Sequence, residues 1–387
     1  MTKHIRLAFI GAGRVNFGGG EGPWDHASRF ENITGIECVG VADIDEPRAR
    51  NVIQTRQSGA NPTVWKNAQA FGSWRQMAEQ VCPDAVVIGL PPACHGHRQG
   101  EHAIEATLAK RGIAMFIEKP LSVVDPYEVA KIADALRRHG VIVSVGYMFR
   151  YARSVNMLRD LLQQLGATPN VVLARYNCAY SGIDRSQWWD VRRSGGPIVE
   201  QGTHFLDLAR YIGGEVDLDS IQVTKIGPGD ERGQLRNLPV DTNATLVDCD
   251  IPVEHRADRA TLAQWRFTNG AIGSLSHGVQ LHGSRYETEL EVWADGVRGI
   301  IRNLYAPQCH LEVRHNGEKQ MRSEIRDDDP YAAEDAAFIE AVRSRNATLI
   351  RSNYDDALRT YRLSWQVGRR GNTFGHQTPI TDVENTD

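Results

Sequence analysis

The group of residues best suited to moving protons is a set of four polar side chains at helical spacing: Glu200, His204, Asp207 and Tyr211. If residues 198–212 form a helix, spacings of four, three and four place these side chains on one face. Pro197 suits a first helical position, and Gly213 with Gly214 suits a stop, so both ends favour that helix. An imidazole beside carboxylates can exchange protons near neutral pH. The plainer alternative is a surface helix with ordinary polar residues.

A glycine-rich turn, Gly11-Ala-Gly13, directly follows the first apolar run of the chain. Such a turn lets backbone N–H groups approach a pyrophosphate. Asn16 stands where the third glycine of G-x-G-x-x-G would be, and residues 17–23 resemble an insertion before the next helix. The segment Trp24-Asp-His26 after it is a candidate to cover the cofactor or the substrate entrance. The position of the turn favours dinucleotide binding over a simple turn.

Asp43 ends the second apolar run, where a carboxylate can accept both ribose hydroxyls of an adenosine. It would also repel a 2′-phosphate, and no Arg or Lys lies next to it. The sequence therefore predicts NAD as the cofactor, with NADP less favoured. The alternative is that Asp43 caps the helix that begins near Pro47.

A folded domain must position these residues, and the pattern of the first 150 residues predicts its strands and helices. Five short apolar runs have the length of buried strands: 5–10, 36–42, 85–90, 113–117 and 141–145. Four segments of helical composition lie between or after them: 47–57, 71–81, 96–110 and 126–139. Near-continuous apolar strands separated by helices indicate a parallel sheet covered on both faces. With right-handed crossovers, residues 1–150 are expected to form a doubly wound α/β domain.

The pattern of predicted secondary structure changes after Tyr151. A helix is predicted over residues 155–165, followed beyond residue 212 by strand-like runs with hairpin signals at Asn269-Gly270, Asp295-Gly296 and Asn316-Gly317. Closing helices are predicted at 331–343 and 354–362, and the polar end, 371–387, is expected to be irregular. Residues 151–387 should therefore form an α+β domain with a large, mostly antiparallel open sheet. The helices within 331–365 are candidates to pack back on the first domain.

Length and composition restrict the class of protein. The chain has 387 residues, 41% of them hydrophobic and 24% charged, which is typical of a globular protein of two domains. A net charge of −4 without a basic stripe argues against nucleic acid or membrane as partner. No segment approaches the ~18 consecutive apolar residues of a membrane-spanning helix. With no signal peptide recognised, a cytoplasmic location is expected.

The six cysteines include no C-x-x-C pair, so reduced and mostly buried thiols are expected. Cys94-His-Gly-His97 is similar to a metal-ligand cluster. No second cluster of similar density completes it, so we expect no metal site.

Two further motifs carry a family resemblance: Leu90-Pro-Pro-Ala-Cys-His95, and Glu118-Lys119-Pro120 after an apolar run. Together with Gly195-Gly196 and the downstream Glu200, His204 and Asp207, they resemble the Gfo/Idh/MocA family of glucose-fructose oxidoreductases, inositol dehydrogenases and relatives. The resemblance covers nearly the whole chain, in order and spacing. It implies a Rossmann domain, a nicotinamide cofactor, and a sugar, cyclitol or related polyol as substrate. It also implies a homodimer or homotetramer formed through the C-terminal sheet.

The resemblance assigns roles residue by residue. Lys119 and His204 match the catalytic lysine and histidine, and Glu200 falls where many members have Asp, one methylene shorter. The expected cofactor-binding residues are Gly11, Gly13, Arg14, Val15, Asn16, Asp43, Leu90, Pro91, Pro92, His95, Glu118 and Lys119. The expected substrate-binding residues are Tyr147, Arg150, Trp188, Trp189, Arg192, Thr203 and Asp207. Trp188, Trp189 and Arg192 are included because aromatic and planar cationic side chains suit stacking on a sugar ring and hydrogen bonding to its hydroxyls, and an aromatic anchor of the loop is the alternative.

The expected reaction is hydride transfer between NAD and a secondary alcohol of a sugar, cyclitol or sugar derivative. Lys119 would stabilise the alkoxide, His204 would act as base, and Glu200 would orient the ring or bind a neighbouring hydroxyl. Plainer alternatives are a salt bridge of Lys119 with Glu118 and a structural polar contact for His204. Two other functions stay open: redox-neutral, NAD-dependent glycoside cleavage, and non-catalytic nucleotide binding by a regulator.

Overall fold

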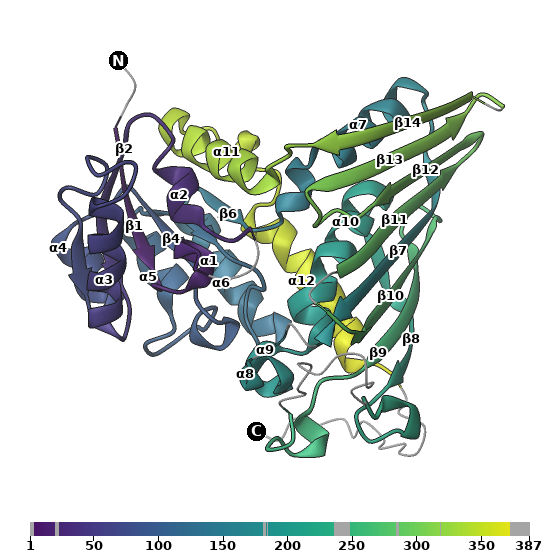
Figure 1. The fold of residues 1–387 in the computed structure, drawn as a ribbon, viewed down its shortest axis with the longest axis horizontal. Coiled ribbons are helices and arrows are strands. Elements are labelled where there is room, and N and C mark those ends of the chain that lie inside the picture. The colour runs from purple at the N-terminus through teal and green to yellow at the C-terminus, as the bar shows by residue number, and fades with distance from the viewer. Residues whose placement is uncertain are drawn as a thin grey trace.

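The computed structural model describes residues 4–19, 23–180, 183, 185–235, 248–283, 286–317 and 319–371. Residues 20–22 of the predicted insertion and 372–387 of the predicted irregular end lie outside the described residues. The fold contains a six-stranded sheet and an eight-stranded sheet, with helices α10 (Thr203–Gly213) and α12 (Tyr354–Arg369) between them (Figure 1). The predicted fold class, a doubly wound α/β sheet followed by a second, α+β sheet, is confirmed.

The first sheet has the order β3-β2-β1-β4-β5-β6, and all its neighbouring strands are parallel. Its strands are β1 (Ile5–Ile10), β2 (Ile36–Ala42), β3 (Gln69–Phe71), β4 (Ala85–Ile88), β5 (Ala114–Ile117) and β6 (Val143–Val145). The short strand β3 was missed, since three residues are too few to form an apolar run.

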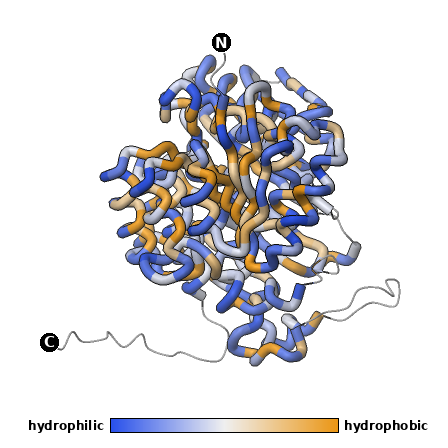
Figure 2. The backbone as a smooth tube through the Cα atoms, turned by 90° about the vertical axis from the view of Figure 1, so that its left-hand side faces the viewer, coloured by the Kyte–Doolittle hydropathy of each residue, from blue (hydrophilic) through white to orange (hydrophobic). Residues whose placement is uncertain are grey.

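Helices cover both faces of this sheet because successive side chains of its strands point to opposite sides. Leu7 and Phe9 pack in one core with α2 (His26–Phe30), α3 (Glu46–Gln57) and α11 (Pro330–Ser344). Ala8 and Ile10 pack in the other core with α4 (Trp74–Gln80), α5 (Ile104–Lys110) and α6 (Pro126–His139). Figure 2 shows the hydrophobic segments running through the strands at the centre of the molecule.

Two predicted helices begin later than expected. The helix predicted from Phe71 starts at Trp74, because Phe71 belongs to β3. The helix predicted from Gly96 starts at Ile104. Gly96 and Gly100 have φ of 69° and 76°, values outside the right-handed helical region, so the chain turns there instead.

The second sheet has the order β14-β13-β12-β11-β7-β10-β9-β8. Its strands are β7 (Pro169–Ala179), β8 (Val216–Ile226), β9 (Ala260–Phe267), β10 (Ile272–Leu281), β11 (Tyr286–Ala294), β12 (Val297–Arg302), β13 (Gln308–His315) and β14 (Lys319–Arg326). All neighbours are antiparallel except β7 and β10. The predicted hairpin signals hold, since Gly270, Gly296 and Gly317 sit in turns with positive φ.

One face of this sheet packs against helices. Its core includes Val155 and Leu158 of α7 (Arg153–Gln164), Phe205 of α10 and Leu363 of α12. These helices lie on the side that faces the first sheet, and the opposite side of the sheet carries no helix in Figure 1. Exposed apolar side chains on that side include Leu262, Ile272 and Trp293.

The last two helices connect the sheets. Phe338 of α11 contacts the rings of Phe30 and Phe116, with centroids 6.4 and 5.8 Å away. The Tyr361 hydroxyl of α12 donates to the Val124 carbonyl (2.6 Å) before α6. Segments late in the sequence thus return to the first sheet and help to fix the seam where the site lies.

Shorter elements complete the described chain: α1 (Arg14–Phe17), η1 (Pro92–Cys94), η2 (Met148–Tyr151), α8 (Ser186–Trp189), α9 (Val191–Ser194), η4 (Ile198–Gly202), η5 (Glu231–Gly233), η6 (Val253–His255) and η7 (Ala347–Leu349). Among the described residues, no helix combines the length and the hydrophobicity needed to cross a membrane.

Candidate active site

The glycine-rich turn at the end of β1 is packed too closely for side chains. Gly11 has φ of 96°, and a Cβ there would lie 2.6 Å from the Gly89 carbonyl oxygen. Gly89 is equally constrained, because a Cβ there would lie 2.4 Å from Asn16 Oδ1. Asn16 is buried and its Nδ2 donates to the Gly11 carbonyl (2.8 Å). Its side chain therefore supports the loop from beneath, and the expectation that it faces the cofactor needs correction.

Asp43 is fixed beside this turn. Its Oδ2 accepts from the Ala12 amide (2.7 Å) and its Oδ1 from the Asp45 amide (2.9 Å). The helix cap is supplied by Asp45, which accepts from the Arg48 amide (3.1 Å), so Asp43 is not the cap of α3. Ile44 between them is 99% exposed. The exposed position of Ile44 was not predicted, although the sequence contains a signal for it, since Ile44 is an apolar residue between two aspartates after a strand.

The turn after β4 presents backbone and proline to the same end of the sheet. Pro91 is exposed, whereas His95 is buried with its Nδ1 2.9 Å from Glu105 Oε1. Glu105 also accepts from the Gly96 amide (2.9 Å), so it fixes the shape of this turn. The His95 ring thus holds the turn from inside. Within the described ranges no group of three or more candidate ligands could hold a metal ion.

Lys119, directly after β5, reaches across to the second half of the chain. Its Nζ donates to the Glu200 carbonyl (2.8 Å) and lies 3.0 Å from Glu200 Oε1. The alternative salt bridge with Glu118 is not formed. Glu118 instead faces His26, whose Nε2 is 2.8 Å from Glu118 Oε1. His26 therefore lies in the interior behind the lysine, and the idea that its segment covers an entrance does not hold for this side chain.

Glu200 lies in η4, a π-helical turn that precedes α10. Its Oε2 accepts from Trp188 Nε1 (2.7 Å), while Oε1 faces Lys119. Burial alone would raise the pKa of Glu200, but the Lys119 ammonium and the Trp188 N–H outweigh it and lower that pKa. Glu200 is therefore ionised at neutral pH.

His204 lies in the first turn of α10 and is buried. Among the described residues its Nδ1 has no hydrogen-bond partner. Aromatic rings surround it: those of Tyr147, Phe149 and Tyr305 lie 5.9, 5.6 and 6.2 Å from its centroid. Burial, and then the charge of Lys119, hold the pKa of His204 well below 6.5. The ring is thus a neutral base next to the lysine.

The predicted single face of Glu200 and His204 is not observed. A π turn is wider than an α turn, so a spacing of four residues no longer superimposes side chains across η4. Glu200 consequently contacts Lys119 and Trp188, and the expectation that it orients the His204 ring is wrong.

Asp207 and Arg150 are structural partners in the seam. Arg150 Nε and Nη2 donate to the Asp207 carboxylate (2.8 and 2.6 Å), and both side chains are buried. Asp356 of α12 provides a second carboxylate 2.5 Å from Arg150, and the Thr360 hydroxyl donates to Asp207 (2.8 Å). The prediction that Arg150 and Asp207 bind substrate is therefore corrected: their hydrogen-bonding groups hold η2, α10 and α12 together.

The other expected substrate residues differ in access. The hydroxyls of Tyr147 and Thr203 bond each other (2.8 Å) below the surface, and Trp189 is fully buried with its N–H on the Ile183 carbonyl. Direct contact of Trp189 with substrate is thus excluded by its burial. Trp188 is half-buried beside Glu200, and Arg192 is exposed in a bidentate pair with Asp190.

One polar group next to the site was missed. His277 of β10 has its Nε2 3.2 Å from Gln201 Oε1, and Gln201 Nε2 contacts Cys178 Sγ (3.4 Å). Burial lowers the pKa of His277 to about 4, against the opposing charge of Glu200. The alternation of β10 places His277 on the helix-covered face, which was the available signal.

The prediction that the thiols are mostly buried overstated their burial. Three of the six are buried: Cys38, Cys178 and Cys309.

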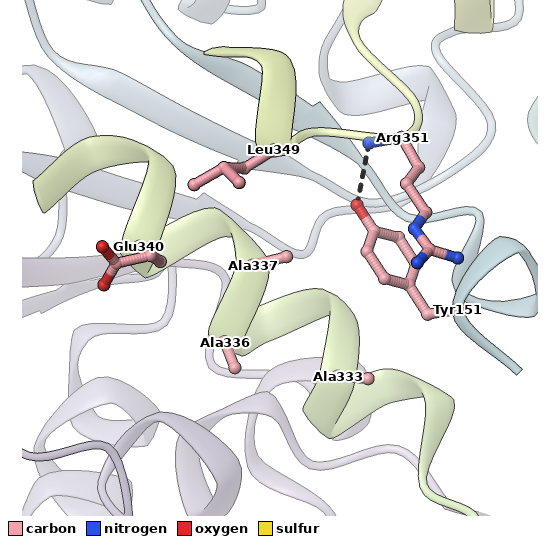
Figure 3. Close-up of a pocket in the computed structure, with 7 residues that line it drawn as sticks. All are labelled: Tyr151, Ala333, Ala336, Ala337, Glu340, Leu349 and Arg351. Carbon is pink, nitrogen blue, oxygen red and sulfur yellow. Dashed lines mark hydrogen bonds between the residues drawn. The ribbon is translucent and has the colours of Figure 1, made fainter. Parts of the chain in front are cut away.

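A separate pocket of about 450 Å³ lies on the outer side of α11 (Figure 3). Its lining residues are Tyr151, Ala333, Ala336, Ala337, Glu340, Leu349 and Arg351. The Arg351 amide donates to the Tyr151 hydroxyl (3.0 Å) across one side of it. Since the pocket contains none of the predicted site residues, it is not the candidate active site.

Comparison with known proteins agrees with this geometry. Residues 5–147 match the Gfo/Idh/MocA model of the oxidoreductase family with an NAD-binding Rossmann fold, and residues 150–297 match an oxidoreductase C-terminal domain. An uncharacterised Schizosaccharomyces pombe protein is 33% identical, with 93% of this chain and 90% of that protein aligned. The chain belongs to the Gfo/Idh/MocA family. It is therefore an NAD(P)-binding oxidoreductase, as its sequence motifs predicted.

Two more distant similar proteins have named activities. The D-glucoside 3-dehydrogenase of Escherichia coli is 26% identical to this Gfo/Idh/MocA protein over 89% of each chain. A crystal structure of a 3-ketoreductase from Actinomadura kijaniata, in complex with NADP and TDP-benzene, has a TM-score of 0.69 at 15% identity. That alignment covers 94% of this chain and 96% of the other. It shows that the two proteins share a fold.

Proposed function

We propose that this oxidoreductase transfers a hydride between NAD and a secondary alcohol of a sugar, cyclitol or sugar derivative. The observation that carries the proposal is the contact between two distant segments, Lys119 after β5 and Glu200 before α10, one turn from His204. The names of the relatives support the substrate class, because one is a glucoside dehydrogenase and a structural neighbour is a 3-ketoreductase.

The residues at the ends of β1 and β2 fit a dinucleotide. A Cβ at Gly13 would meet no atom within 4 Å, so the backbone of the turn is open to the close approach of a pyrophosphate. Asp43 would accept the ribose hydroxyls with the remaining lone pairs of its oxygens, and exposed Ile44 would pack against the adenine. When bound, NAD would supply the hydride acceptor or donor. We favour NAD over NADP because the Asp43 carboxylate would repel a 2′-phosphate.

Lys119 and His204 would handle the hydroxyl proton. In oxidation the O–H and C–H bonds break and a carbonyl forms, so the protein must take up one proton as the hydride leaves. His204 is neutral, and its Nδ1 has no hydrogen-bond partner in the part of the chain that the structure describes, so it can accept that proton. Lys119, fixed by Glu200, would stabilise the negative charge developing on oxygen. Reduction would use the same groups in reverse.

The test is a panel of polyols, glycosides and sugar phosphates with NAD, followed by the absorbance of the reduced nicotinamide. Lys119→Ala should lower turnover by more than about a hundredfold, the scale for losing a positioned transition-state group. Arg137→Ala, at an exposed side chain, is the matched control and should keep full turnover. Absence of turnover across the panel with NAD bound would contradict the proposal.

Two other outcomes point to different functions. Release of an aglycone without net NADH would indicate redox-neutral glycoside cleavage by the same residues. If Lys119→Ala and His204→Ala both left every measurable function unchanged, a nucleotide-binding regulator would be the better description.

We also propose a division of labour along the chain. Residues 1–150 would bind the dinucleotide, and residues 151–387 would bind substrate and form a homodimer or homotetramer. The uncovered side of the eight-stranded sheet, with exposed Leu262, Ile272 and Trp293, supports assembly through that face. Light scattering on the purified protein and on Leu262→Glu would test it, with a monomeric wild type as the contrary result. The six unpaired thiols favour a reducing compartment such as the cytoplasm.

A further inference from the structure

His26, at the start of α2, lies between two carboxylates in the interior of the molecule. Its Nδ1 is 2.9 Å from Asp335 Oδ1 on α11, and its Nε2 is 2.8 Å from Glu118 Oε1. The side chains of His26, Glu118 and Asp335 are 1%, 9% and 0% exposed. Because ionised carboxylates only accept hydrogen bonds, both ring nitrogens donate, and the ring is an imidazolium.

The surrounding charges keep this ring protonated. Burial alone would lower the pKa of His26, but Asp335 and Glu118 outweigh it and raise that pKa to about 10. Glu334 of α11 also faces the cluster, and burial raises its pKa well above 4.5. Arg29, whose charge acts on Asp335, pairs with Asp329 (2.8 Å) at the start of α11. The cluster is thus one imidazolium shared by two carboxylates.

Glu118 is held beneath the backbone of the residue that follows it. Its Oε2 accepts from the Lys119 amide (3.2 Å), and a Cβ on Gly146 would lie 2.9 Å from its Oε1. The Lys119 ammonium extends the other way, to Glu200. Two carboxylates thus lie next to Lys119: Glu200, which holds its ammonium, and Glu118, which is held by His26 and by the Lys119 amide.

The geometry points to His26, oriented by Asp335, as a positioning residue that keeps Glu118 away from Lys119. Lys119 then remains with Glu200, facing the site that the proposed function assigns to the reacting hydroxyl, on which this inference rests. His26 itself contacts neither Lys119 Nζ nor Glu200 in the described chain. It acts by occupying the competing carboxylate.

This arrangement explains why three distant parts of the chain meet behind β5. Residues near the predicted insertion contribute the imidazolium, the Glu118-Lys119 turn contributes the carboxylate, and α11 contributes Asp335. Helix α11 lies beside α2 (Figure 1), and the three side chains of the cluster are buried between these elements and β5. In a dry site each ion pair is stronger than at the surface, which makes the choice of partner firm.

The test compares H26L, H26Q and the double variant H26L/E118Q with the wild type. H26L should lower kcat by about tenfold or more, because the ammonium is drawn to Glu118, while the Kd for NAD changes less. The double variant removes the rival charge and should recover most of what H26L lost. A double variant as slow as H26L would overturn the inference.

Crystal structures of H26L and the wild type give a readout that needs no substrate. We expect the Glu118 carboxylate of H26L to rotate to within ion-pair distance of Lys119 Nζ. A Glu118 that stays in place in H26L would overturn the inference. If the wild type turned over no member of the panel, the proposed function would fail, and these structures would still decide the positioning role.

Two variants separate positioning from folding. H26Q keeps one donor toward Glu118, so it should lose less turnover than H26L; equal loss in both, with Glu118 unmoved, would contradict the inference. Arg29→Ala breaks the neighbouring contact between α2 and α11 and removes none of the hydrogen bonds between His26 and its two carboxylates. It should keep wild-type turnover, and a loss as large as that of H26L would assign the effect to helix packing.

Discussion

Replacing Asp207 by Asn tests whether this residue holds the seam or binds substrate. Its carboxylate accepts two hydrogen bonds from Arg150, at 2.8 and 2.6 Å, and one from Thr360 at 2.8 Å. Asparagine keeps one acceptor but turns an NH₂ group toward one of the guanidinium donors. The variant therefore loses the charge and opposes two donors in a buried place.

The expected cost follows from the remaining partners. Removing one partner of a buried ion pair typically costs about 3–5 kcal/mol. Arg150 retains Asp356 at 2.5 Å, which is partly exposed, so the charge is not left alone. We therefore expect Asp207→Asn to lower the free energy of unfolding by about 2–4 kcal/mol, which is slightly less than the typical cost because Asp356 still pairs with Arg150.

Urea unfolding followed by tryptophan fluorescence measures this loss, with Asp134→Asn as the control. Asp134 pairs with Arg137 at the surface, where such pairs contribute less than about 1 kcal/mol. Turnover of Asp207→Asn below its unfolding midpoint should show an almost unchanged KM for the substrate. A variant as stable as the control but with a strongly raised KM would refute the structural role and restore Asp207 to the substrate site.

Other perturbations give equally direct outcomes. Glu200→Asp should lower kcat/KM by about tenfold or more, since one methylene fewer breaks the contact with Lys119 or with Trp188, and a charge-assisted bond is worth ~1.5–3 kcal/mol; steady-state kinetics at wild-type level would contradict this. Asp43→Ala should weaken NAD binding and relax discrimination against NADP in calorimetric titrations, and an unchanged preference would exclude Asp43 as the ribose reader. Because the pKa of His26 rises from 6.5 to about 10 on folding, the folded state binds the extra proton in that window. The free energy of unfolding should therefore fall as pH rises through it, by up to about 1.4 kcal/mol per unit. Urea titrations of H26Q should lack that slope, and an equal slope in both proteins would contradict the assignment.

The sequence allowed prediction of the features that depend on local pattern. Apolar runs gave the long strands of the first sheet, and turn residues such as Gly270 gave the hairpins of the second. The Gfo/Idh/MocA family motifs gave Lys119 and the helix of His204, and these do meet through Glu200. In each case a few neighbouring residues contain the information, because periodicity and backbone freedom are local properties.

The features that were missed depend on partners distant in the chain. Arg150 and Asp207 are 57 positions apart, and nothing in their types separates a buried ion pair from two substrate ligands. His26 and Asp335 are 309 positions apart, so their pairing follows from the packing of α11 on α2 alone. The π turn was also hidden, because residue types do not reveal whether a helical segment hydrogen-bonds four or five residues back.

The charge balance of the site bears on the substrate itself. The predicted catalytic and substrate-binding residues include three cations, and each has a carboxylate partner. Lys119 pairs with Glu200, Arg150 with Asp207, and Arg192 with Asp190. His204, the remaining base, is neutral because burial and Lys119 oppose its protonation. A phosphorylated sugar would need an unpaired cation to offset the desolvation of its charge, and separating Lys119 or Arg150 from its carboxylate in the interior to provide it would cost much of the binding energy. Uncharged sugars, cyclitols or glycosides should therefore show higher kcat/KM than the corresponding phosphates in the panel, since hydroxyl groups can bond to the Lys119–Glu200 pair without separating it.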